Sequence, residues 1–193
     1  MKKVVVISTS LRAGSNSQVL AEQFAEGAKA AENEVEFITL RGKEIKFCVG
    51  CLACQKTGAC VFKDDVPAIM KQILNADVVY WATPIYYYEM SGQMKTLIDR
   101  MNAMYTKDYR FRDVYLLTTA TEDEEYVPKR ADAGLTGWID CYPNSDHRDG
   151  ICVTTHELGG VGMENNHDKI DKCLKELDSE NNKQITLCKT LII

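Results

Sequence analysis

Four cysteines follow one another at short intervals in the first third of the chain, with the spacing Cys48-x2-Cys51-x2-Cys54-x5-Cys60. Four thiolates on one loop can ligate a cubane iron–sulfur cluster or a zinc ion. Zinc sites usually take two cysteine pairs divided by a longer insert, so the close triplet favours the cluster. Free thiols and a redox disulfide are the alternatives that the spacing leaves open.

A second group of chemically useful residues lies between positions 8 and 17, where the sequence reads Ser-Thr-Ser-Leu-Arg-Ala-Gly-Ser-Asn-Ser. Hydroxyl groups, the Arg12 guanidinium and the N–H groups of a following helix N-terminus suit a phosphate. The segment lacks the glycine patterns of nucleoside triphosphate loops and dinucleotide folds. It also lacks the acidic residue of a response receiver and the cysteine nucleophile of a phosphatase. We expect a phosphate-binding loop, with a solvated strand-to-helix turn as the plain alternative.

Three consecutive tyrosines, Tyr86 to Tyr88, follow Thr83-Pro84-Ile85. Aromatic side chains beside a ligand can stack on a planar ring, and the backbone of such a loop can hydrogen-bond the edge of a heterocycle. The alternative is that the three rings only cover an edge of a sheet. A phosphate loop and an aromatic loop on neighbouring strands would together suit a mononucleotide lying across the top of the sheet.

Alternating strands and helices must position these three groups. Continuous β-branched runs indicate strands buried on both faces, and apolar residues at helical spacing indicate the helices between them. The alternation predicts one α/β domain over residues 1–193, a three-layer sandwich around a five-stranded parallel sheet of order 2-1-3-4-5, with a Cys-rich loop at 41–63. In that order a ligand lies at the carboxyl ends of strands 1 and 3, which points to residues 8–17, 83–92 and 118–125. The expected strands are Val4–Ile7, Val35–Leu40, Val78–Ala82, Val114–Thr119 and Ile151–Thr154. The expected helices are capped by Asn16, by Asp64 or Asp65 and by Ser91, a fourth opens at Pro128, and a last one runs across Ile170–Leu177.

Composition excludes two classes of partner. The chain has 23 basic and 28 acidic residues, a formal net charge of −5, and so lacks the basic excess of nucleic-acid-binding proteins. The longest segment without a charged residue, Val78–Tyr88, is shorter than the ~20 residues that a membrane-spanning helix needs. Lys2 and Lys3 precede an apolar run too short for a secretory signal. We therefore expect no nucleic acid, no membrane and a cytoplasmic location, where eight cysteines would not form a disulfide framework.

Taken together, these motifs resemble the flavodoxin-like NAD(P)H-dependent FMN reductases, and more narrowly the iron–sulfur flavoproteins. The resemblance covers roughly residues 3–105 and also includes Asp64-Asp65, residues 82–86 and Met94-Lys95-x3-Asp99-Arg100. It implies FMN with its phosphate in the first loop and its isoalloxazine ring on the third-strand loop, and a homodimer or homotetramer. The positions assigned to FMN are Ser10, Arg12, Ser15, Asn16, Ser17, Pro84, Ile85, Tyr86, Tyr87 and Thr119, and those assigned to a possible [4Fe–4S] cluster are Cys48, Cys51, Cys54 and Cys60.

The expected function is an FMN-dependent oxidoreductase that takes electrons from NAD(P)H and reduces a flavin, a quinone, a similar small molecule or a redox protein. FMN carries such chemistry, so no side chain is expected as a catalytic acid or base. Two departures from the family stand out: Arg12 is a lone basic residue, and the acidic segment 118–125 would repel the phosphates of a nicotinamide cofactor. The alternatives are an electron carrier that receives electrons at the cluster, and a non-redox mononucleotide binder with a zinc-stabilised loop. Lys95, Asp99 and Arg100 are expected at a helix or subunit contact.

Overall fold

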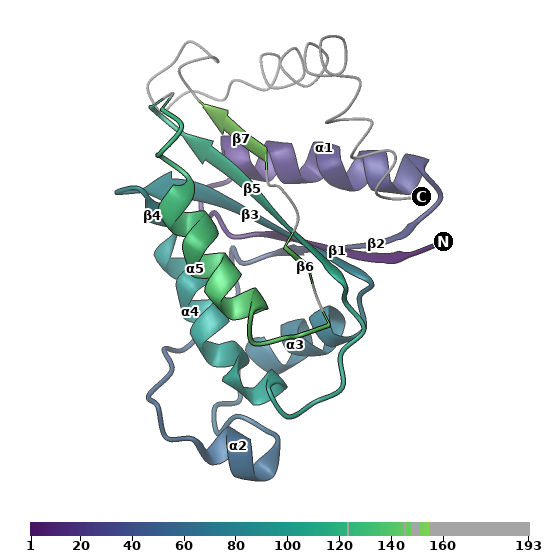
Figure 1. The fold of residues 1–193 in the computed structure, drawn as a ribbon, viewed down its shortest axis with the longest axis vertical. Coiled ribbons are helices and arrows are strands. Elements are labelled where there is room, and N and C mark those ends of the chain that lie inside the picture. Colours follow the sequence, from purple (N-terminus) through teal and green to yellow (C-terminus); the bar gives the residue numbers. More distant parts are fainter. Residues whose placement is uncertain (123, 145, 148–150, 155–193) are drawn as a thin grey trace.

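The computed structural model describes residues 1–122, 124–144, 146–147 and 151–154. Over these residues strands and helices alternate, and helices lie on both faces of a central sheet (Figure 1). The helix expected across Ile170–Leu177 lies outside the described residues. The strands are β1 (Lys3–Ser8), β2 (Glu34–Thr39), β3 (Val78–Tyr86), β4 (Glu89–Met90), β5 (Asp113–Ala120), β6 (Asp146–His147) and β7 (Ile151–Thr154), and the helices are α1 (Asn16–Ala30), α2 (Ala53–Thr57), α3 (Val66–Leu74), α4 (Gly92–Arg100), the 3-10 turn η1 (Met101–Met104) and α5 (Lys129–Ile139).

The order of the long strands confirms the predicted flavodoxin-like sheet. β2, β1, β3 and β5 are parallel neighbours in that order, and β7 pairs in parallel with the second half of β5. Two short strands were not predicted: β4 pairs antiparallel with the end of β3, and β6 pairs with the beginning of β5. Both are two residues long, too short to show a hydrophobic period in the sequence.

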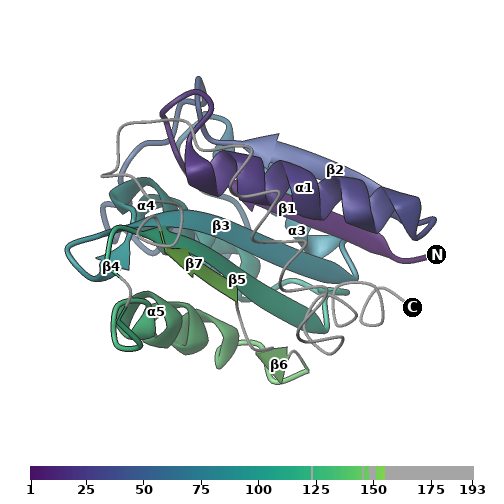
Figure 2. The same ribbon diagram turned by 90° about the horizontal axis from the view of Figure 1, so that it is seen from above.

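The two faces of the sheet carry separate apolar cores, because successive side chains of a strand point to opposite sides. Val4, Val6 and Tyr80 pack with Phe24 of α1 and its neighbours on one face. The opposite face packs Trp81 and its neighbours against α3, α4 and α5. Figure 2 shows α1 lying over the strands and α3 and α4 behind them. The predicted three-layer arrangement follows from this division of buried residues.

Several element boundaries differ from the sequence-based expectation. Ser15, rather than Asn16, caps α1, since its backbone is extended and its hydroxyl accepts a hydrogen bond from the N–H of Gln18 at 3.2 Å. The third strand continues through residues 83–86, which were expected to be a loop, because it keeps pairing with β5 and then with β4. The Cys-rich segment contains the short helix α2. Ser91 caps α4 as predicted, accepting from the N–H of Met94.

Candidate functional site

The loop between β1 and α1 is tied to the end of β3 by a buried threonine. The Thr9 hydroxyl donates to the carbonyl of Ala82 at 2.9 Å and lies 3.1 Å from the hydroxyl of Ser91, which caps α4. Ser10 is also buried, and its hydroxyl accepts from the N–H of Arg12. The Arg12 side chain is exposed and forms no ion pair with any described residue. The loop is thus held in place while its one guanidinium remains available to an anion.

The N-terminus of α1 continues this loop with three buried polar residues. Ser15, Asn16 and Ser17 are each less than 5% exposed, and the hydroxyls of Ser15 and Ser17 are 3.3 Å apart. The first turn of α1 carries no acidic residue. The unpaired N–H groups and the dipole of a helix N-terminus favour an anion at such a position. Five of the predicted FMN residues, from Ser10 to Ser17, therefore lie together on one loop and helix terminus.

Three buried polar atoms near the carboxyl ends of the central strands have no hydrogen-bond partner among the described residues. They are Oγ of Ser8, Oδ1 of Asn16 and Oγ1 of Thr118. Ser8 is the last residue of β1, and Thr118 pairs in register with Thr83 near the end of β3. A buried polar group without a partner costs about 1–3 kcal/mol, so native structures rarely leave one unsatisfied. Ser8 continues the row of Val4 and Val6 on the α1 face, whereas Thr118 continues the row of Val114 and Leu116 on the opposite face. Of the three atoms, Oδ1 of Asn16 at the N-terminus of α1 is the one that a hydroxyl of a mononucleotide such as FMN would most directly supply with a partner.

The aromatic loop is a tight hairpin between β3 and β4. Tyr86 pairs with Glu89, so Tyr87 and Tyr88 alone form the turn, with φ of +51° and +64°. Two-residue hairpin turns of this kind favour Asn-Gly, because two left-handed residues with side chains cost about 1–2 kcal/mol each. Tyr87 is 96% exposed despite this cost. Strain of this kind is concentrated at functional sites, which makes the turn a candidate ligand contact.

The hairpin and the end of β5 enclose a cavity of about 360 Å³. Its lining includes Ile85, Tyr87, Ala120 and the carboxylate of Glu122. The Tyr88 hydroxyl donates to both carboxylate oxygens of Glu122, at 3.0 and 3.1 Å. This hydrogen bond, together with the negative charge of Glu122, raises the pKa of Tyr88. The acidic segment predicted at the rim therefore places one carboxylate in the wall of the cavity that could hold a flat ring.

The predicted ring-binding residues do not all share that cavity. Tyr86 lines a separate groove of about 670 Å³ that also includes Leu11, Phe47 and Gln93. Pro84 and Thr119 are directly paired in the sheet, beneath the hairpin. Ser8 and Thr118 lie within the ligand regions 8–17 and 118–125 that the sequence predicted, but neither was assigned to FMN, although the polar end of an otherwise apolar strand was an available signal. It also did not foresee the Tyr88–Glu122 bond, which joins residues 34 positions apart.

The four clustered cysteines line one small cavity at the far end of α4. Cys48 and Cys51 are exposed, Cys54 and Cys60 are half-buried, and all four are free thiols. They enclose a space of about 20 Å³ together with Val49, Leu52, Val61, Phe62, Arg100 and Asn102. Among the described residues no three His, Cys, Asp or Glu side chains are close enough together to hold a single metal ion. The four thiols thus line one common space in the structure.

A buried ion pair closes the base of the cysteine loop. Arg100 donates from Nη1 and Nη2 to the two oxygens of Asp64, at 2.6 and 3.0 Å, and from Nη1 to the carbonyl of Lys46 at 2.7 Å. Both charged side chains are fully buried. Asp64 also accepts from the N–H groups of Lys46 and Val66, and Asp65 accepts from the N–H of Glu44. We call this set of contacts the neck, because it joins the two ends of the loop.

The ionisation of the neck follows from these contacts. Burial alone would raise the pKa of Asp64, but the hydrogen bonds from Arg100 and from two backbone N–H groups outweigh it and lower that pKa. Burial alone would lower the pKa of Arg100, but Asp64 and, to a smaller extent, the Cys60 sulfur outweigh it and raise that pKa. The neck is therefore a charged pair with a cysteine of the loop beside it. Arg100 was expected at a helix–helix or subunit contact. In the structure it lies at the end of α4 and contacts the two ends of the cysteine loop instead.

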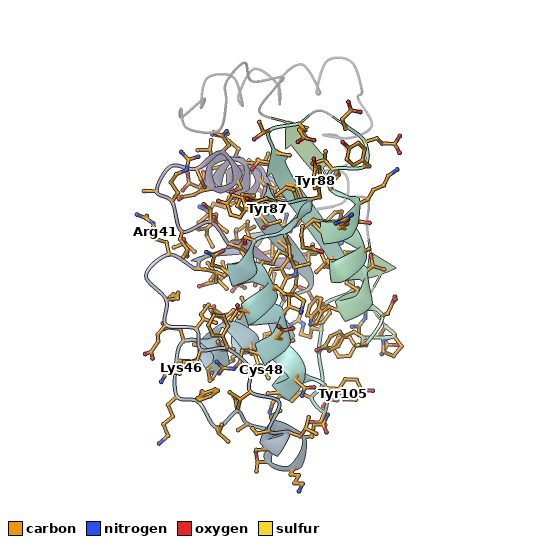
Figure 3. The ribbon with its side chains drawn as sticks, turned by 90° about the vertical axis from the view of Figure 1, so that its left-hand side faces the viewer. Arg41, Lys46, Cys48, Tyr87, Tyr88 and Tyr105 are labelled. Atoms are coloured by element: carbon orange, nitrogen blue, oxygen red, sulfur yellow. The ribbon has the colours of Figure 1, made fainter. Side chains whose placement is uncertain are left out.

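The two candidate regions lie at opposite ends of α4. Thr9 contacts Ser91 at its N-terminus, whereas Arg100 ends the helix beside the cysteines. Figure 3 shows Tyr87 and Tyr88 well separated from Cys48 and Lys46. At 1.5 Å per residue, the nine residues of α4 span about 13 Å. A cofactor at the hairpin and a cluster in the cysteine loop of the same chain would be separated by at least that helix.

Comparison with known proteins decides the family. The family described as NADPH-dependent FMN reductase matches residues 2–135, which include the first loop, the cysteines, the hairpin and β5. The chain belongs to this family. The fold agrees with family membership, because the strand order β2-β1-β3-β5 brings residues 8–17, 83–92 and 118–122 to one edge of the sheet. Among the described residues, no helix has the length and apolar character needed to cross a bilayer.

Individual relatives are similar over about half of the chain. An iron–sulfur flavoprotein of Methanocaldococcus jannaschii, MJ1083, is 37% identical over 98 residues, which are 51% of this chain and 51% of that protein. YwqN of Bacillus subtilis, described as a putative NAD(P)H-dependent FMN-containing oxidoreductase, is 35% identical over 111 residues, 58% of either chain. The chain spans about half the length of the curated relatives it matches. A crystal structure of an azoreductase from Bacillus anthracis has the same fold, with a TM-score of 0.65 at 15% identity, over 93% of this chain and 100% of that one.

Proposed function

We propose that this chain is an FMN-dependent oxidoreductase that accepts electrons from NAD(P)H and passes them to a flavin, a quinone or a similar acceptor. The observation that carries the proposal is the buried, unpartnered Oδ1 of Asn16 at the N-terminus of α1. This helix N-terminus is suited to a phosphate, and the cavity at the hairpin and the end of β5 is suited to a ring. FMN supplies the hydride and electron chemistry when it is bound.

The residues of the chain then act by binding and orientation. Ser10, Ser15, Ser17 and the Arg12 guanidinium would hold the phosphate through N–H and O–H donors. The side-chain oxygen of Asn16 would accept from a ribityl hydroxyl. Pro84, Ile85 and Tyr87 would support the ring, with Thr119 beneath them in the sheet and Tyr86 on the opposite side of the hairpin. No described side chain is needed as an acid or base.

Glu122 bears on the choice of electron donor. Its carboxylate lies in the wall of the proposed ring cavity, and a negative charge there disfavours the phosphates of a nicotinamide cofactor. NADPH carries one phosphate more than NADH, so we infer that NADH is the better donor of the two. The Tyr88 hydroxyl donates a hydrogen bond to this carboxylate and so offsets part of the charge.

The test is chemical identification of the bound chromophore followed by anaerobic reduction. The protein is expected to release FMN, identified by mass, and bound FMN is expected to lose its visible absorption when NADH is added without oxygen. Release of FAD, or no flavin binding after reconstitution with FMN, would refute the cofactor. Bound FMN that neither nicotinamide bleaches would refute the NAD(P)H activity and leave the second candidate below.

The second candidate is an iron–sulfur flavoprotein that receives electrons from a redox protein at a [4Fe–4S] cluster. The arrangement that favours it is the shared cavity of Cys48, Cys51, Cys54 and Cys60, with every thiol free. Lys46, Lys56 and Lys63 on the same loop would offset the negative charge of a cluster with four thiolate ligands.

A cluster is sensitive to air, so iron and sulfide are measured on protein made anaerobically. About four irons per chain, and fewer in Cys51→Ala, would support this candidate. Zinc in place of iron would support the stabilised-loop alternative.

A homo-oligomer, dimer or tetramer, completes the proposal. The groove of about 670 Å³ beside Tyr86 includes the apolar side chains of Leu11 and Phe47, which are 49% and 77% exposed. A second subunit in such an oligomer would cover these two exposed apolar side chains. Light scattering after size exclusion measures the mass, and a mass of one chain would refute the oligomer.

A further inference from the structure

The Arg100 guanidinium has more hydrogen-bond donors than the neck uses. Of its five N–H groups, two donate to Asp64 and one to the carbonyl of Lys46. Nε is buried and has no hydrogen-bond partner in the described part of the chain. The Nε–H and the second N–H of Nη2 lie on the same edge of the planar group. The N–H groups on this edge are buried and have no hydrogen-bond acceptor among the described residues. Burial of a charged donor without an acceptor costs free energy.

The surroundings of Arg100 identify what its free edge can reach. The residue lines the same cavity as the four cysteines. One face of the guanidinium is covered by Phe62, with 5.0 Å from the central carbon to the ring centroid, and its end is occupied by Asp64. The cysteine sulfurs of this cavity are candidate acceptors for the free edge, and Cys60 is the one whose sulfur helps to raise the pKa of Arg100.

A second donor reaches the same set of sulfurs from the adjoining turn. The Nδ2 of Asn102, in η1, donates to Sγ of Cys54 at 3.8 Å. Cys54 and Cys60 are the half-buried pair of the four cysteines, whereas Cys48 and Cys51 are exposed. The two donors therefore lie beside the two sulfurs that are least exposed to solvent. Both donors belong to the continuous helical segment from Gly92 to Met104.

We propose that Arg100 and Asn102 are positioning residues that donate N–H···S hydrogen bonds to the thiolates of Cys60 and Cys54 and thereby raise the reduction potential of the cluster held there. The inference rests on the iron–sulfur candidate of the proposed function. Its physical basis is that a cluster gains one negative charge when it takes up one electron, and donors to the ligand sulfurs stabilise that charge. Asp64 keeps the guanidinium charged and fixed, so the donors need no rearrangement.

Arg100→Lys and Asn102→Leu separate this role from a merely structural one. Lysine keeps the charge and a partner for Asp64 but lacks the Nε–H edge, because its ammonium is a point charge without a planar fork. Leucine keeps the size of Asn102 and removes its donor. The matched control is Lys107→Gln, which removes a cation beside Gly58 of the same loop without removing a donor to sulfur.

The measurement is a mediated redox titration of anaerobically prepared protein, with one-electron reduction by dithionite followed by electron paramagnetic resonance. Iron, sulfide and FMN are quantified on the same samples. We expect unchanged iron per chain and a midpoint potential that is lower in both variants than in the wild type, and lower than in Lys107→Gln. Wild-type potentials in both iron-loaded variants, or an equal shift in the control, would overturn the inference. Wild-type protein without iron would overturn the cluster itself, and the inference with it. If Arg100→Lys does not fold, Asn102→Leu decides alone.

Discussion

The Tyr88 hydroxyl donates to both oxygens of Glu122, at 3.0 and 3.1 Å, and so joins the strained turn of the hairpin to the segment that follows β5. The two residues form one side of the proposed ring cavity. Because the turn carries two left-handed residues without glycine, this hydrogen bond is one of the contacts that hold an unfavourable backbone conformation.

The Tyr88–Glu122 bond predicts sensitivity to alkaline pH. The pKa of Tyr88 is raised above its ordinary value of 10.0, first by the hydrogen bond and charge of Glu122. The bond therefore stabilises the folded state below pH 10 and is lost as the pH rises through the higher pKa of the folded state. Thermal midpoints measured from pH 7 to pH 11 should fall more steeply in the wild type than in Tyr88→Phe. Tyr105→Phe, at an exposed tyrosine, is the control and should follow the wild type.

Replacement of Arg12 tests the phosphate site. A charge-assisted hydrogen bond contributes about 1.5–3 kcal/mol, and each ~1.4 kcal/mol is tenfold in affinity. Arg12→Ala should therefore weaken FMN binding by roughly ten- to a hundredfold, measured by titration of the apoprotein. Riboflavin has no phosphate and should lose much less affinity. Equal losses for the two ligands would place Arg12 outside the phosphate site.

The neck predicts a large effect of a small change at Asp64. Asp64→Asn removes the charge that Arg100 faces and leaves a buried cation, which typically costs about 3 kcal/mol or more of unfolding free energy. The lowered pKa of Asp64 also means that its contribution is present above the ordinary value of 3.8 and is lost as the pH falls through the value of the folded state. Urea unfolding from pH 7 to pH 3 measures both effects.

Asp65→Asn is the matched control for that experiment. Asp65 accepts from the N–H of Glu44 but is partly exposed and has no fully buried cation to neutralise. Its loss should be about 1 kcal/mol. A loss as large as that of Asp64→Asn would contradict the special role of the buried pair.

Two glycines of α5 predict a contrast in stability. Alanine is favoured over glycine inside a helix by up to about 1 kcal/mol. A Cβ at Gly137 would meet no described atom within 4 Å, so Gly137→Ala should raise the free energy of unfolding by roughly that amount. A Cβ at Gly134 would lie 2.9 Å from the terminal methyl of Met90 in β4. Gly134→Ala should therefore gain less stability and weaken FMN binding by shifting the hairpin. Equal stability gains with unchanged FMN affinity would show that Met90 moves without cost.

The strands and helices that depend on local sequence pattern were predicted from the sequence. Continuous runs such as Val4–Ile7 indicated buried parallel strands, and the order of the long strands followed from right-handed crossovers. The extension of β3 through Pro84 was missed because proline and polar residues usually end a strand, whereas here β5 and β4 continue the pairing. The hairpin itself was missed because Tyr-Tyr carries none of the Asn-Gly signal of such turns.

The contacts that shape the two candidate sites are between distant positions. Arg100 and Asp64 are 36 residues apart, and Thr9 and Ser91 are 82 residues apart. Periodic patterns in the sequence do not predict contacts between such distant residues. The resemblance included Asp64 and Arg100 among its matching residues but did not assign them to a cofactor. The assignment of individual residues to FMN and to a cluster stays a prediction, which the experiments above address.

The neck makes the cysteine loop a self-contained insertion. Its ends are held together by Asp64, Asp65 and Arg100. Among the described residues, the fully buried members of both apolar cores lie outside the segment between residues 47 and 63, and only the half-buried Cys54 of that segment packs against one of them. Folding of the domain and assembly of a metal centre can then be separate events in the life of the protein. A chain made without iron would still reach its native sheet, and the loop could be shortened or exchanged for another while the rest of the domain stayed intact.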